Sequence, residues 1–247
     1  MRSTTATRTS TDSADAAHAR PRIGLLGIMQ PLYDQMLPGI TERQAAYARE
    51  IGDALANVAD VVVAPPVKDR DGAERELLGL EAGGLDGLLV VMLTYGPAMH
   101  VARALDGTRL PICLANVQPV PQVTAEWDMA DLTYNQGIHG AQDTANAMVR
   151  AGRAFHAITD DWRARSFREA VGRWARAAAA VTRWRSLKVA VFGYAMNGMG
   201  DIRVDEHTLL RRLGPQVDAL APGVLHRGVT SVSAAEVQNV IAEEDSR

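Results

Sequence analysis

Leu85-Asp86-Gly87-Leu88-Leu89-Val90-Val91-Met92-Leu93 is apolar almost throughout. A strand covered by helices on both faces has such a continuous apolar run, whereas a half-exposed strand alternates with polar residues. The run is therefore predicted to be a central strand of a parallel sheet. Thr94-Tyr95-Gly96-Pro97 follows, and Pro97 suits the first position of a helix.

Similar short apolar runs lie on both sides of this strand in the sequence. They predict further strands at residues 22–29, 59–64, 110–117 and 155–159, and helical patterns at 41–57, 73–82, 144–149 and 161–184. Strands that alternate with helices predict an α/β fold, a doubly wound parallel sheet with helices on both faces. An incomplete second α/β domain is expected to follow it.

The predicted domain boundaries follow from composition. Residues 1–20 are mostly Ser, Thr, Ala, Asp and Arg and are predicted to be a disordered tail, because such a segment buries too little apolar surface. Residues 21–184 form the predicted amino-terminal domain. Residues 185–247 begin a second α/β domain with a strand at 187–192. Its last helix ends on acidic residues without a glycine or proline stop, so we expect this domain to be truncated.

Two local signals make sharper predictions. Thr41 and Gln44, and again Ser233 and Glu236, have the spacing of a capping box at a helix start. Cys113 is the single cysteine and lies in an apolar run, so it is predicted to be a buried, inert thiol.

Charge and hydropathy exclude several classes of protein. The net charge of -3 gives no electrostatic case for nucleic acid or an anionic membrane surface. No segment approaches the ~18 continuous apolar residues of a membrane span. The hydrophobic fraction of 47% and the charged fraction of 22% are those of a globular protein, and a cytoplasmic location is expected.

The most polar candidate for a functional site is the run Tyr134-Asn135-Gln136-Gly137-Ile138-His139-Gly140-Ala141-Gln142-Asp143. It is predicted to be a loop that leads into a helix. Either it binds a ligand, or Asn135 and Asp143 cap backbone amides while His139 is merely exposed. Other polar clusters follow the predicted strands and should converge with it, because open α/β sheets bind ligands beyond the carboxyl ends of their strands. These clusters are Gln30 with Tyr33, Thr94 with Tyr95, and Asn116 with Gln118.

Together these motifs resemble the L-arabinose isomerase family and its L-fucose isomerase-like relatives over roughly residues 22–247. The resemblance implies an aldose–ketose isomerase of carbohydrate metabolism that acts on a pentose or 6-deoxyhexose, usually with Mn2+. Asn135-Gln136 and His139-Gly140 look like the family's NQ-x-x-HG motif, whose histidine reaches the substrate across a subunit interface. The other substrate-binding positions that the resemblance implies are Gln30, Leu32, Tyr33, Tyr95 and Met196.

The chain also departs from the family pattern. Asp34 stands where the family often has glycine, and the glutamates and histidines of the family's metal site would lie beyond residue 247. The resemblance therefore implies an isomerase chain that carries the substrate-positioning half and no metal site. On its own, this chain is expected to be inactive. A non-catalytic sugar-binding or regulatory module, or one half of a split isomerase, remains an alternative. A homo-oligomer or a partner chain with the missing half is expected.

Overall fold

The computed structural model describes residues 20–194, 196–200 and 204–245. The predicted tail therefore lies outside the described residues except for Arg20, as do Ala195 and Asp201 of the glycine-rich loop that follows residue 192. Backbone contacts divide the chain into two compact units, Met1–Thr182 and Arg183–Arg247. Among the described residues, no helix is both long and apolar enough to cross a membrane.

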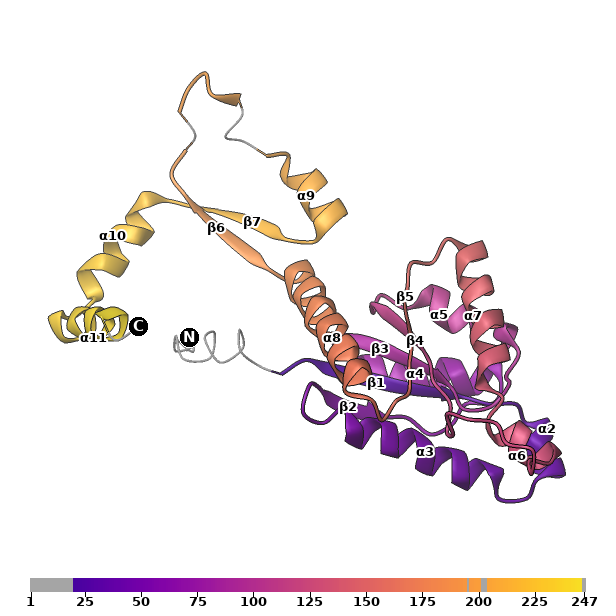
Figure 1. Ribbon diagram of the computed structural model, residues 1–247. Helices are drawn as coiled ribbons and strands as arrows, with labels where there is room; N and C mark the ends of the chain where they lie inside the picture. Colours follow the sequence, from indigo (N-terminus) through magenta and orange to yellow (C-terminus); the bar gives the residue numbers. More distant parts are fainter. Residues whose placement is uncertain (1–19, 195, 201–203, 246–247) are drawn as a thin grey trace, which may run out of the picture. The chain divides into compact units, whose positions relative to one another are not determined.

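A single parallel sheet organises the first unit (Figure 1). Its strands are β1 (Arg22–Ile28), β2 (Asp60–Val63), β3 (Gly87–Met92), β4 (Ile112–Asn116) and β5 (His156–Thr159). They are arranged in the order β2-β1-β3-β4-β5, and each pair is parallel. The chain moves outward in one direction from β1 to β2 and in the other from β3 to β5. The predicted doubly wound parallel sheet is thereby confirmed, and its strand order is the flavodoxin-like one.

Helices cover both faces of this sheet. They are α2 (Leu32–Met36), α3 (Ile40–Ala54), α4 (Arg70–Ala82), the 3-10 helix η1 (Ala98–His100), α5 (Ala102–Gly107), α6 (Met129–Tyr134), α7 (Gly137–Ala151) and α8 (Arg165–Arg185). Helices α3 and α8 pack on one face, and α4, α5 and α7 pack on the other.

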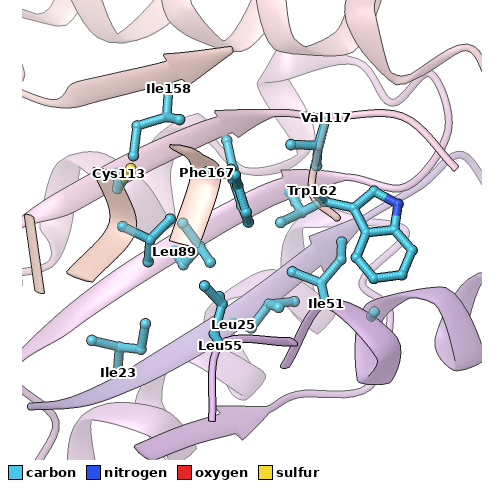
Figure 2. Packing of buried hydrophobic residues seen from close by; sticks show 14 of the residues in the cluster. Ile23, Leu25, Ile51, Leu55, Leu89, Cys113, Val117, Ile158, Trp162 and Phe167 are labelled. Atoms are coloured by element: carbon cyan, nitrogen blue, oxygen red, sulfur yellow. The ribbon is translucent and has the colours of Figure 1, made fainter. Parts of the chain in front are cut away.

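The alternation of side chains along each strand divides the core into two layers. In β1, Ile23 and Leu25 face α3 and α8, whereas Leu26 and Ile28 face the opposite helices. Figure 2 shows the first layer, in which Phe167 of α8 lies among strand residues. Cys113 is fully buried there, as predicted, and burial raises the pKa of its thiol to about 12.

The second unit is a smaller α/β element. It contains β6 (Lys188–Phe192), α9 (Glu206–Leu213), β7 (Gln216–Leu220), α10 (Pro222–Ser231) and α11 (Ala234–Asp245), with β6 and β7 parallel. The capping box predicted at Ser233 is confirmed, because Ser233 N donates to Glu236 Oε2 at 2.8 Å and Glu236 N donates to Ser233 Oγ at 3.3 Å. Strand β7 and helix α10 were not predicted from the sequence.

The capping box predicted at Thr41 and Gln44 is wrong. Helix α3 begins one residue earlier, after Gly39, whose φ of 87° lies in the left-handed region that glycine adopts readily. The Thr41 hydroxyl donates to the Asp34 carboxylate, and Gln44 Nε2 donates to the Tyr134 carbonyl at 3.0 Å. Both side chains therefore bond to other segments of the fold instead of the helix terminus.

The Phe167→Ala variant tests the two-layer core. Phe167 is fully buried, so truncation removes apolar contacts and leaves a cavity, and we expect a loss of about 3–5 kcal/mol in the free energy of unfolding. Leu78→Ala is the control, because Leu78 lies on α4 with 65% of its surface exposed and should change stability by less than about 0.5 kcal/mol. Urea denaturation followed by tryptophan fluorescence measures both, and equal losses would contradict the assignment of the core.

Candidate functional site

Polar residues meet where β1 and β3 end side by side. Gln30 follows β1 and Thr94 follows β3, and the Gln30 backbone N–H donates to Thr94 Oγ1 at 3.4 Å. In a doubly wound sheet, this is the point at which the chain leaves two neighbouring strands in opposite directions, and ligands bind there. We call Gln30, Tyr33, Thr94, Tyr95 and Gln136 the carboxyl-end cluster.

Tyr33 is the most enclosed aromatic residue of the carboxyl-end cluster. It lies on α2, the first helix after β1, is only 9% exposed, and its hydroxyl donates to Gln136 Oε1 at 3.3 Å. Burial raises the pKa of the Tyr33 phenol, and nearby Tyr95 raises it further. Tyr33 is therefore a neutral hydrogen-bond donor throughout the physiological pH range.

The run from Tyr134 to Asp143 is mostly helical, so its prediction as a loop is wrong. Tyr134 ends α6, only Asn135 and Gln136 separate the two helices, and α7 begins at Gly137. The reason is that packing on β3 holds this glycine-containing stretch in a helical turn that its local sequence favours only weakly.

Asn135 and Asp143 both accept bonds from backbone amides, as one of the two sequence interpretations expected. Asn135 is buried and pairs with both backbone groups of Val120, accepting from N at 2.9 Å and donating to O at 3.0 Å. Asp143 Oδ2 accepts from Ala98 N at 3.0 Å. Asn135 therefore holds the segment after β4, and Asp143 holds the segment after β3.

Two glycines let the first turn of α7 lie directly on the end of β3. A Cβ atom added at Gly137 would lie 2.4 Å from the Met92 carbonyl oxygen. One added at Gly140 would lie 2.6 Å from the Met92 methyl group and 3.1 Å from Gly96 N. A side chain at Gly137 would push α7 away from the carboxyl-end cluster, because the Met92 carbonyl is backbone and cannot rotate aside.

His139 lies in the same helical turn but faces away from the sheet. It is two positions after Gly137, which places it about 200° around the helix axis, and its side chain is exposed. Leu32 is half exposed on α2. Met196 belongs to the second unit, where it is 71% exposed.

The structure thus brings together Gln30, Tyr33 and Tyr95 of the predicted site residues. Thr94, from one of the polar clusters expected to converge there, lies with them, and the structure adds Gln136, which was not among the predicted binding residues. Gln136 was visible as a motif member, but only the fold places it opposite the Tyr33 hydroxyl.

The donor set of the carboxyl-end cluster does not fit Mn2+. Its side chains are amides, phenols and a hydroxyl, and none is a carboxylate or an imidazole, the groups that supply the charge and most of the ligands at a protein site for such an ion. In the part of the chain that the structure describes, no group of three or more His, Cys, Asp or Glu side chains could hold a metal ion. The cluster is suited to hydrogen bonding with a polar organic ligand instead.

The fold and this cluster define a doubly wound α/β domain with a polar, aromatic site at the switch point of its sheet. Residues 24–186 match the family model of the L-arabinose isomerase N-terminal domain. The chain therefore belongs to the L-arabinose isomerase family.

Individual relatives agree with the family model. The chain is 28% identical to an L-arabinose isomerase of Clavibacter sepedonicus over 221 residues, covering 87% of this chain and 43% of that protein. It is also 28% identical to one of a Nocardioides strain, over 83% of this chain and 42% of the relative. The chain thus spans less than half the length of these relatives. The first match covers 87% of the chain, which is more than the whole first unit, so the match extends into the second unit.

Gly137→Ala should destabilise the protein by about 1–3 kcal/mol, since the added methyl group collides with the Met92 carbonyl. Gly79→Ala is the matched control. Gly79 lies within α4 with no atom within 4 Å of the added Cβ, so alanine there should stabilise the helix by up to about 1 kcal/mol. Urea denaturation distinguishes the two, and a stabilising Gly137→Ala would contradict the close approach.

Proposed function

We propose that this chain is a homologue of sugar aldose–ketose isomerases that positions the sugar. In this proposal, a pentose or 6-deoxyhexose binds at the carboxyl-end cluster. The observation that carries it is the Tyr33–Gln136 hydrogen bond beside Tyr95, at the point of the sheet where ligands bind. Amides both donate and accept, a neutral phenol donates, and aromatic rings cover the apolar faces of a sugar.

A second copy of the chain is proposed to complete the site. His139 is exposed on the outer face of α7, so it does not meet the carboxyl-end cluster of its own protomer. The family resemblance implies a histidine that acts across a subunit interface, and the exposure of His139 supports this role. Leu32 and Met196 are proposed as additional contacts to the sugar.

The described cluster supports positioning and not proton transfer. Moving a proton between C1 and C2 of a sugar requires a base, and the developing enediolate requires a cation or strong donors. Gln30, Tyr33 and Tyr95 orient hydroxyl groups, but amides and neutral phenols do not act as the base at neutral pH. We therefore propose that Mn2+-dependent chemistry, where it occurs, requires residues beyond those of the cluster.

Sugar binding tests the proposed site directly. Wild-type protein should bind L-arabinose or L-fucose in isothermal titration calorimetry. Tyr33→Phe should weaken binding about 2- to 12-fold, the effect of losing one neutral hydrogen bond. His156→Ala is the control. His156 is exposed at the amino end of β5, whereas the cluster lies at the carboxyl ends of the strands. Unchanged affinity in Tyr33→Phe would contradict the role of Tyr33.

A turnover assay separates positioning from catalysis. With Mn2+ added, the purified chain should bind sugar but show no aldose–ketose interconversion, since its cluster lacks a base and a metal site. Turnover that depends on Mn2+ would overturn the positioning-only proposal and require a metal site that the cluster does not contain. If the chain binds sugar without turnover, and a second polypeptide then supplies turnover, the result would favour a split isomerase over a sugar-binding module.

A further inference from the structure

Asp34 joins three segments next to the carboxyl-end cluster. It lies on α2, directly after Tyr33, at the position where this chain departs from the family's pattern. One carboxylate oxygen accepts from the Thr41 hydroxyl in the first turn of α3. The other forms an ion pair with Lys68, which lies between β2 and α4. We call these three residues the Asp34 network.

The backbone places Lys68 where it can reach Asp34. Val67 extends the sheet beside the end of β1: Val67 N donates to Gly27 O at 2.9 Å, and Met29 N donates to Val67 O at 3.0 Å. Lys68 follows directly and is thereby held to the strand that leads into α2. The ammonium group thus comes from a rigid edge of the sheet and not from a free loop.

Apart from the Asp34 network, helix α2 is held to the core by Tyr33, with Leu37 packed beside its end. It is a short helix without a side-chain cap at its amino end, and Leu32 and Met36 on it are exposed. Isolated helices of this length are unstable in water, so tertiary contacts must fix its position. Tyr33 packs inward, while the Asp34 network ties the same turn to α3 and to the segment after β2.

The Asp34 carboxylate keeps its negative charge at neutral pH. The hydrogen bond from Lys68 lowers the pKa of the Asp34 carboxyl, and the bond from Thr41 lowers it further. The carboxylate is therefore ionised well below neutral pH. Charge-assisted bonds of this kind are stronger than neutral ones and impose a defined geometry on both partners.

We infer that Asp34 and Lys68 are positioning residues that hold α2 so that the Tyr33 hydroxyl meets Gln136 and the sugar. The inference rests on the proposed function for its ligand, and on the geometry of the Asp34 network for its mechanism. Asp34 acts through Tyr33 and does not itself contact the sugar. The network orders α2 before the sugar binds. Without the network, α2 must be ordered on binding, and this entropic cost lowers the affinity for the sugar.

Hydrogen exchange in the full chain without sugar tests the mechanism. The Leu37 amide donates to Tyr33 O at 2.8 Å and reports the opening of α2. Asp34→Asn and Lys68→Met should speed its exchange about 3- to 10-fold, because the helix opens more often. Lys68→Arg retains the positive charge, so the Leu37 amide should exchange as slowly as in the wild type. Glu169→Gln is the matched control, since it breaks the exposed Arg165–Glu169 pair on α8 and should leave the Leu37 amide unchanged. Unchanged exchange in both Asp34→Asn and Lys68→Met overturns the inference.

Sugar affinity then separates positioning from a purely structural role. Asp34→Asn and Lys68→Met should raise the Kd for the sugar at least about threefold under conditions where each variant is folded, and Lys68→Arg should bind as wild type does. If the wild type binds sugar and the two variants bind equally well, the positioning role is wrong although the proposed function stands. If the wild type binds no sugar, the proposed function is wrong and the role toward a sugar falls with it, while hydrogen exchange still decides whether the network holds α2.

Discussion

The close approach of helix α7 to the carboxyl end of β3 is the constraint on which the site depends. Gly137 and Gly140 carry no side chain, so the first turn of α7 rests on Met92 and Gly96. That contact fixes the residues on either side of the turn. Asn135 then reaches Val120, Gln136 reaches Tyr33, and Asp143 reaches Ala98. One turn of helix thus sets the positions of the segments that follow β1, β3 and β4.

The doubly wound sheet explains why the polar residues collect where they do. Residues of opposite parity along β1 and β3 pack against different helices, so both faces of the sheet are covered and only its ends remain for a ligand. At the amino ends, short connections from α3, α4, α5 and α7 lead into β2, β3, β4 and β5. At the carboxyl ends, the chain departs in opposite directions after β1 and β3 and leaves Gln30 and Thr94 side by side.

Two capping boxes with similar spacing show where local sequence suffices. The one at Ser233 forms as predicted, because its side chains are exposed and find their nearest partners within the helix terminus. The one at Thr41 does not form, because Asp34 and the Tyr134 carbonyl offer partners from elsewhere in the fold. The loop predicted at residues 134–143 failed for a related reason: glycine lowers local helix propensity, but here it is what permits the helix to pack.

The sequence by itself determined the fold class, the order of the strands along the chain, the burial of Cys113 and the family to which the chain is similar, because continuous apolar runs and short motifs are local signals. The neighbours of each strand, the pairing of Tyr33 with Gln136 and the Asp34–Lys68 ion pair were decided only by the tertiary structure. These partners lie 103 and 34 residues apart in the chain, and no local pattern records a contact over such separations. Packing of helices on the sheet brings them together, and that packing depends on shape across the whole unit.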